Sequence, residues 1–184
     1  MIEVRQTGLE GVIEIVPRRF TDSRGFFSEV YNAAVFREAG IDLVFVQDNH
    51  SMSTQRGVLR GLHYQLPPRA QDKLIRVGRG AILDIAVDIR RSSPTFGQWI
   101  AIELSAEKWN QLLVPKGFAH GFVTLTENTE VLYKVTDVYS AIHDRAIRYD
   151  DPSIAVRWPP ELGDLILSEK DRKAPTLRDA DVFD

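Results

Sequence analysis

The sequence predicts a mainly β protein with a few short helices, folded as an antiparallel sandwich or barrel such as a jelly roll. Three observations favour this class. The chain divides into many short stretches with the rhythm of β-strands, and turn residues cluster between them, as in Pro67-Pro68 and Gly78-Arg79-Gly80. Helical periodicity is scarce. Many short strands at this spacing are typical of two-layered or closed antiparallel folds.

The expected strands are bounded by turn residues and follow one another at short intervals. In chain order they are Gly11–Pro17, Gly25–Tyr31, Leu43–Ser53, Val58–Gln65, Lys73–Val77, Ala81–Asp88, Trp99–Leu104, Gln111–Val114, Gly121–Leu125 and Thr129–Val138. Asn32–Ala39 is expected to be a short helix, because Asn32 can cap its first turn and Gly40 can end it. Ser168–Arg172 is expected to form one further helical turn.

Length and composition favour one domain, residues 1–184, which is long enough to bury a core. Lys and Arg total 23 and Asp and Glu total 26, so the net charge of −3 gives no support to a nucleic-acid partner. The absence of cysteine excludes disulfides and thiolate metal sites. Charges between Met1 and Arg5 argue against a signal peptide, and no apolar stretch approaches the ~20 residues of a membrane span. A cytoplasmic protein with no membrane partner is expected.

Strand alternation makes a prediction about two polar residues in Val58–Gln65. Strict alternation places Arg60 and His63 on opposite faces of the sheet. Both can serve one site only if the strand bulges or twists between them, and Gly61 is the residue that permits this. In Thr129–Val138 the same rule, continued to Tyr139, places Tyr133 and Tyr139 on one side.

Few side chains in this sequence can move a proton near neutral pH, since it has four histidines and no cysteine. His63 is either a general base or a hydrogen-bonded structural histidine, and His120 is either functional or packed in its aromatic-flanked strand. Tyr133 by itself reads as a core or edge residue of a strand. Lys73 and Arg24 by themselves read as a solvated lysine and a turn arginine.

Metal and nucleophile chemistry fit the sequence poorly. Pro115-x-Gly117-x-x-His120 matches half of the metal pattern of the double-stranded β-helix (cupin) fold, but His63 is followed by Tyr64 and Gln65 instead of completing His-x-His. Two ligands are fewer than a metal site needs, so no metal is expected. Gly-x-Ser-x-Gly and phosphate-binding glycine loops are also absent from the sequence, so bound phosphates must be held by Arg and Lys side chains.

Taken together, several stretches resemble one family of sugar-nucleotide epimerases with a cupin fold. They are Arg19–Phe27, Phe45–Ser51, Gly57–Gln65, Lys73-Leu74, Asp84–Asp88, Ser93–Gly97, Val114–Phe122, Tyr133-Lys134, Asp151-Pro152 and Ser168–Asp171. Their order and combination resemble the dTDP-4-dehydrorhamnose 3,5-epimerase family over nearly the whole chain. The resemblance implies a cupin-type jelly roll that needs no cofactor.

The resemblance also implies a reaction. The substrate would be dTDP-4-dehydro-6-deoxy-D-glucose, inverted at C3 and C5 to dTDP-4-dehydro-L-rhamnose during dTDP-L-rhamnose synthesis. Both carbons lie next to the C4 ketone, so each can lose a proton to give an enolate, which needs a base on one face and an acid on the other. By family match His63 is the base, Asp171 orients it and Tyr133 is the acid. Lys73 and His120 would stabilise the enolate oxygen.

The family match extends to the nucleotide. The substrate-binding residues that it implies are Arg24, Phe27, Glu29, Gln47, Asn49, Arg60, His120, Tyr139, Asp144 and Lys170. Among these, Tyr139 would stack on thymine, and Asp144 stands where the family usually has Glu. Family members are homodimers, which implies that the segment from Arg24 to Glu29 serves the neighbouring subunit's site.

Three alternatives remain open at the level of sequence. Relatives that invert only C3 or only C5 keep nearly all of these residues, so a mono-epimerase for another deoxysugar pathway is an alternative. A non-catalytic sugar-nucleotide-binding cupin would be expected to lose His63, Tyr133 or Asp171, all of which are present. A metal-dependent cupin is the third, and metal analysis of the purified protein separates it from the others.

Overall fold

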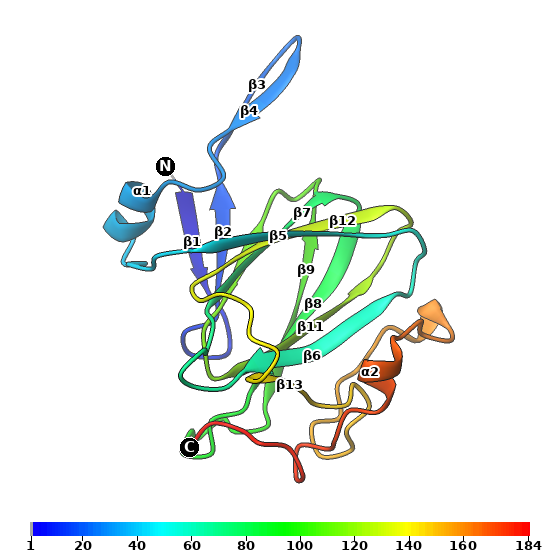
Figure 1. Ribbon diagram of the computed structural model, residues 1–184. Helices are drawn as coiled ribbons and strands as arrows, with labels where there is room; N and C mark the ends of the chain where they lie inside the picture. Colours follow the sequence, from blue (N-terminus) through cyan, green and yellow to red (C-terminus); the bar gives the residue numbers. More distant parts are fainter. Residues whose placement is uncertain (1) are drawn as a thin grey trace.

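The computed structural model describes residues 2–184 and confirms the predicted mainly β jelly roll, in which two antiparallel sheets face each other (Figure 1). In spatial order the larger sheet contains β1 (Ile2–Gln6), β2 (Ile13–Pro17), β10 (Gln111–Val114), β7 (Lys73–Arg79), β12 (Thr129–Val135) and β5 (Gln47–Ser53). The smaller sheet contains β13 (Asp144–Ala146), β6 (Leu59–Gln65), β11 (Phe118–Thr124), β8 (Ala81–Asp88) and β9 (Trp99–Ser105).

The hydrophobic core lies between these sheets. Alternate side chains of facing strands meet there, for example Ile75 and Val77 of β7 with Ile82 and Ala86 of β8. The outer face of each sheet is covered as well: Phe36 packs against the larger sheet, and Leu177 against the smaller one. With both outer faces covered, the open end of the sandwich is where a binding site can form.

The short helices agree with their capping signals. α1 (Ala33–Glu38) is capped by the Asn32 side chain, which accepts a hydrogen bond from the Ala34 N–H at 3.0 Å, and Gly40 follows at φ +85°. α2 (Glu169–Arg172) is capped by Ser168. A 3₁₀ turn, η1, spans Pro160–Leu162. Within residues 2–184, no helix has the length and apolar character needed to cross a membrane.

Some predicted strand boundaries were wrong, and three strands were not predicted. The strand expected over Leu43–Ser53 begins only at Gln47, and the one expected over Thr129–Val138 ends at Val135. The unpredicted strands are β1, β13 and β3 (Arg19–Asp22). β13 has three residues and exists because it pairs with the end of β6, a tertiary contact that local sequence does not encode.

The predicted distortion at Gly61 is confirmed. His63 of β6 pairs with His120 of β11, whereas Arg60 pairs with Phe122. The three residue steps from Arg60 to His63 therefore lie opposite only two residue steps, from Phe122 to His120. Gly61 has φ +134°, and a Cβ there would lie 2.4 Å from the Cα of Gly121. This extra residue lets Arg60 and His63 turn their side chains to the same side.

The hairpin made of β3 and β4 (Gly25–Ser28) projects from the body of the protein and contacts it at its base, where Phe26 packs on Trp109 (Figure 1). It forms its own two-stranded sheet, and its aromatic side chains are exposed, with Phe27 at 70%. An isolated hairpin with exposed aromatic rings is marginally stable alone and is typical of a segment that packs against another molecule.

Candidate active site

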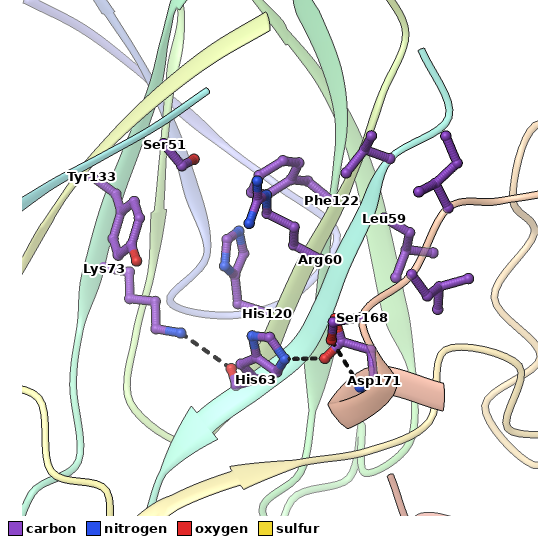
Figure 2. A pocket seen from close by; sticks show the side chains of 13 residues that line it. Ser51, Leu59, Arg60, His63, Lys73, His120, Phe122, Tyr133, Ser168 and Asp171 are labelled. Carbon is purple, nitrogen blue, oxygen red and sulfur yellow. Dashed lines mark hydrogen bonds and ion pairs between the residues drawn. The ribbon is translucent and has the colours of Figure 1, made fainter. Parts of the chain in front are cut away.

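A cavity of about 420 Å³ opens between the two sheets and α2 (Figure 2). Its lining residues are Ser51, Val58, Leu59, Arg60, His63, Lys73, His120, Phe122, Tyr133, Ile166, Leu167, Ser168 and Asp171. A second cavity, of about 210 Å³, shares His63, Lys73 and Tyr133 with the first. The two cavities adjoin at these three side chains, and together they are called the trough. We call them the inner cavity, which is the larger, and the outer cavity.

His63 and Asp171 form a pair at the wall of the inner cavity. Nε2 of His63 lies 2.5 Å from Oδ1 of Asp171. The side chain of His63 is 31% exposed, whereas that of Asp171 is 4% exposed. α2 holds the aspartate in place, because the Asp171 N–H donates to the Ser168 hydroxyl at 3.1 Å.

The contact with His63 keeps Asp171 ionised. Burial by itself raises the pKa of Asp171, but its hydrogen bond and charge interaction with His63, with help from Ser168, leave that pKa below its usual value. Asp171 is therefore ionised at neutral pH and accepts the Nε2 proton of His63. Nδ1 is then the nitrogen of His63 that remains available to take a proton from a molecule in the cavity.

Tyr133 faces this pair from the other sheet. It lies on β12, so its phenol reaches the inner cavity from the side opposite β6 (Figure 2). Burial raises the pKa of Tyr133. The phenol thus keeps its proton at neutral pH, and the cavity has a hydrogen donor on one side and a base on the other.

Lys73 lies between them at the start of β7 and is only 9% exposed, so the solvated lysine of the sequence-based alternative is wrong. Its Nζ donates to the His63 carbonyl oxygen at 3.1 Å. Burial lowers the pKa of Lys73 to about 8, although the negative charges of Asp144 and Asp84 oppose part of this shift. A compact cation of this kind is suited to an oxygen that develops negative charge.

A second histidine–aspartate pair lies deeper. Nε2 of His120 is 2.8 Å from Oδ1 of Asp84, with side-chain exposures of 9% and 0%. Burial is the main reason that the pKa of Asp84 is raised, although His120 and Lys73 oppose it. His120 lines the inner cavity with Phe122, which lies two residues further along β11 and therefore on the same face.

Polar side chains line the outer cavity and hold one another in place. Gln47 accepts from the Tyr139 N–H at 2.9 Å and donates to Asn49 at 2.8 Å. Asp144 pairs with Lys170. The ring of Tyr139 is 60% exposed, so a flat ligand can stack on it. Tyr133 and Tyr139 do face one trough, but β12 ends before Tyr139, so alternation is not the reason.

The structure brings most of the predicted site residues into this trough. Arg60 lines the inner cavity and donates to the Ser53 hydroxyl at 3.3 Å. Arg24, Phe27 and Glu29 are not brought there: they belong to the projecting hairpin and its C-terminal end, and the Arg24 side chain is 88% exposed. Within this chain Arg24 contacts Asp22 in the hairpin turn.

Sequence reasoning missed the apolar part of the inner cavity and the partner of His120. Val58, Leu59 and Ile166 belong to stretches that read as ordinary core strand or loop. Asp84 did carry a signal, because it is a carboxylate inside the apolar run Ile82-Leu83-Asp84-Ile85, and a buried charge of that kind needs a partner.

Metal coordination depends on several ligands that converge. His63 and His120 contact different aspartates. Over residues 2–184, no three His, Cys, Asp or Glu side chains are arranged to hold an ion. The expectation that the protein uses neither metal nor cofactor stays a prediction.

Comparisons with known proteins point to one family. A family model described as dTDP-4-dehydrorhamnose 3,5-epimerase matches residues 6–179. A Sinorhizobium fredii protein of that name is 53% identical over 163 residues, covering 89% of this chain and 83% of the relative. One from Pseudomonas aeruginosa is 51% identical over 183 residues, covering 99% of both.

A solved structure is similar over the same extent. The dTDP-6-deoxy-D-glucose-3,5-epimerase of Legionella pneumophila, in complex with dTDP-4-keto-L-rhamnose, superimposes with a TM-score of 0.93 at 45% identity, covering 98% of this chain and 95% of that one. Sequence and fold therefore agree over nearly the full length of both proteins. The chain belongs to the dTDP-4-dehydrorhamnose 3,5-epimerase family.

Proposed function

We propose that this protein converts dTDP-4-dehydro-6-deoxy-D-glucose to dTDP-4-dehydro-L-rhamnose by inverting C3 and C5. One observation carries the proposal: the His63–Asp171 pair and Tyr133 line one cavity from opposite sheets. Inversion of a carbon next to a ketone requires a base on one face of the sugar ring and an acid on the other. We take residues 1–184 to act as one domain, located in the cytoplasm.

The proposed chemistry uses two proton transfers at each carbon. Nδ1 of His63 takes the proton from C3 or C5, and the electrons of that C–H bond form the C=C bond of an enolate whose charge lies on O4. Asp171 stabilises the imidazolium that results. The phenol of Tyr133 then gives its proton to the same carbon from the opposite face, and the C4 ketone reforms. Solvent returns a proton to Tyr133 and removes one from His63.

Lys73 and His120 are proposed to stabilise the charge on O4. Lys73 is nearly buried, and a donor in a site of low dielectric is worth more than in water. Removing one such donor in other enzymes costs ~10²–10³ in kcat. Because both side chains line the same cavity as His63 and Tyr133, a ketone oxygen between them is within reach of donors and base together.

The outer cavity is proposed to hold the nucleotide. Tyr139 offers an exposed ring for the thymine base, and Gln47 and Asn49 offer amides. Arg60 and Lys170 are the cations proposed to contact the diphosphate. Asp144, beside Tyr139 and Lys170, is proposed to orient these two side chains.

We further propose that the protein is a homodimer in which the β3–β4 hairpin enters the partner's trough. The proposal is supported by the exposure of Phe27 and Arg24 and by the projection of the hairpin away from its own body. Mixing Arg24→Ala with His63→Ala subunits tests it. If each site uses Arg24 of the partner subunit, the mixed dimer contains one site with both native side chains and regains activity. If each site uses Arg24 of its own subunit, every combination stays inactive.

The reaction itself is tested by incubating the protein with dTDP-4-dehydro-6-deoxy-D-glucose in D2O and following the sugar by NMR. The proposal expects deuterium at both C3 and C5. Deuterium at only one carbon identifies a mono-epimerase instead. If neither carbon exchanges while the nucleotide still binds, the protein is a non-catalytic sugar-nucleotide-binding cupin and the proposed function is wrong.

A further inference from the structure

The buried pair of His120 and Asp84 has a geometry that the proposed reaction leaves unexplained. Oδ1 of Asp84 lies 2.8 Å from Nε2 of His120. Oδ2 is fully buried and has no hydrogen-bond partner within residues 2–184. A buried carboxylate oxygen without a partner is costly, so its retention calls for a reason.

The sheet explains why the two side chains meet. His120 of β11 pairs with His63 on one side and with Ala86 of β8 on the other. Asp84 lies two residues from Ala86, so its side chain is on the same face of the sheet as those of Ala86 and His120. The same face thus carries His63, His120 and Asp84 in a row, and the first two line the inner cavity.

The contact with Asp84 decides which nitrogen of His120 meets a ligand. Nε2 is occupied by Asp84, so Nδ1 is the nitrogen available to the cavity. An unprotonated Nδ1 would repel an oxygen that carries negative charge, whereas a protonated Nδ1 would donate to it. Whether His120 can donate a hydrogen bond to such an oxygen therefore depends on which atoms of the pair carry protons.

Asp84 favours the donor form of His120. If Asp84 is ionised and His120 neutral, the pair has a net negative charge centred on a fully buried carboxylate, which is unfavourable. One added proton makes the pair neutral overall and places N–H at Nδ1, whether the second proton lies on Nε2 or on Asp84. Buried coupled groups share protons in this way.

Other titratable and charged groups line the same cavity from the neighbouring elements. They are Arg60 and His63 of β6, Lys73 of β7, Tyr133 of β12 and Asp171 of α2. Lys73 is the cation that could replace the added proton as a countercharge. Its Nζ donates instead to the His63 carbonyl oxygen, and among the described residues it forms no ion pair with Asp84.

We propose that Asp84 is a positioning residue, which orients His120 and keeps it protonated at Nδ1 so that it donates to the enolate oxygen. This inference rests on the proposed function, because it needs an oxygen that becomes negative in the inner cavity. Asp84 touches no substrate itself. It acts through His120, as the carboxylate beside a metal-bound or catalytic histidine does.

The protonation state can be measured directly in the native enzyme. Histidine labelled with ¹⁵N has only four rings to resolve, and His120→Gln identifies the signal of His120. At about pH 7.5, above the ordinary imidazole pKa of ~6.5, the proposal expects a proton on Nδ1 of His120. A bare Nδ1 at that pH overturns the proposal.

A double-mutant cycle then separates positioning from folding. Asp84→Leu keeps roughly the size of the side chain but can make no hydrogen bond to Nε2, so His120 loses both its fixed orientation and its added proton. We expect kcat to fall roughly 10–100-fold with KM within about twofold. His120→Gln keeps a donor toward Asp84 and removes Nδ1. In that background, Asp84→Leu is expected to change kcat less than about twofold. An equal loss in both backgrounds overturns the proposal.

Asp151→Leu is the matched control. Asp151 is as buried as Asp84, but it accepts from the Ser153 and Leu177 N–H groups and lines neither cavity. We expect it to lower Tm while leaving kcat within about twofold. The ¹⁵N measurement does not depend on turnover, so absence of deuterium exchange by the native enzyme would refute the proposed function separately.

Discussion

Two histidine–aspartate pairs face the same cavity, and their surroundings shift the pKa values of the two aspartates in opposite directions. His63–Asp171 lies at the wall, where the imidazole is 31% exposed and the pKa of Asp171 is lowered. His120–Asp84 lies deeper, where the imidazole is 9% exposed and the pKa of Asp84 is raised. The imidazole of the first pair can exchange a proton with water, whereas burial makes a net charge on the second pair unfavourable. Identical residue types are thus suited to a base in one place and to a donor in the other.

Removing the base should have the largest effect. We expect His63→Ala to lower the rate of deuterium exchange at C3 and C5 by roughly 10²–10⁴-fold, because general-base catalysis is lost. Binding of dTDP, measured by calorimetry, should change little. His50→Ala is the control, since His50 is an exposed histidine that contacts Glu130 outside both cavities. Exchange that survives in His63→Ala would show that another group is the base.

Neutralising the aspartate of the wall pair should have the next largest effect. In Asp171→Asn the amide can donate to Nε2 of His63, which moves the proton to Nδ1 and removes the base. The same substitution costs ~10⁴ in kcat in a serine protease triad, and here we expect roughly 10²–10³. The loss should exceed that of Asp84→Leu, measured by steady-state kinetics. Equal losses of kcat for the two substitutions would show that the two pairs do not differ in the way proposed.

The pairing of β6 with β11, which places His63 opposite His120, can be disrupted at Gly61. A Cβ at this position meets Gly121 at 2.4 Å, so Gly61→Ala should destabilise the protein by about 3 kcal/mol in chemical unfolding. Gly25→Ala is a matched control, because Gly25 has a similar φ of +130° and open space around it. That change should cost about 1–2 kcal/mol. Equal costs would mean that the close approach of β6 and β11 is unimportant.

Replacing Lys73, which lies beside both pairs, should change the stability of the fold less than Gly61→Ala does, and the change should be a gain. Burial lowers its pKa from 10.5 to about 8, so below pH 8 the folded state holds a disfavoured charge. Lys73→Met should therefore raise stability at neutral pH by about 1–2 kcal/mol while lowering kcat. The unfolded chain binds more protons between pH 8 and 10.5, so native stability rises there and the gain shrinks.

Thermal unfolding from neutral pH to about pH 10 checks this dependence. The exposed Lys116→Met is the control and should show a difference from the native protein that stays flat with pH. A gain for Lys73→Met that grew with pH would contradict the sign of the shift. It would mean that the lysine is stabilised as a cation by Asp144 and Asp84 more than it is penalised by burial.

Local signals in the sequence predicted the parts of the fold that depend on neighbours along the chain. Asn32 and Ser168 cap the helices expected from them, and Gly61 bends β6 as the alternation of Arg60 and His63 required. β13 could not be predicted in this way, because three residues have no periodicity and take their conformation from pairing with β6. β1 does carry a local signal, because Ile2, Glu3, Val4 and Arg5 alternate between apolar and charged residues as in a half-buried strand.

The sequence alone determined that the protein is mainly β, where its helices begin, and which side chains are able to exchange protons. Only the tertiary structure decided which of them work together. Asp171 lies 108 residues from His63 and Asp84 lies 36 from His120, and sheet pairing and the placement of α2 bring each pair into contact. The structure also decided which pair reaches water. Protonation depends on desolvation and on charges from several elements, which no local stretch of sequence contains.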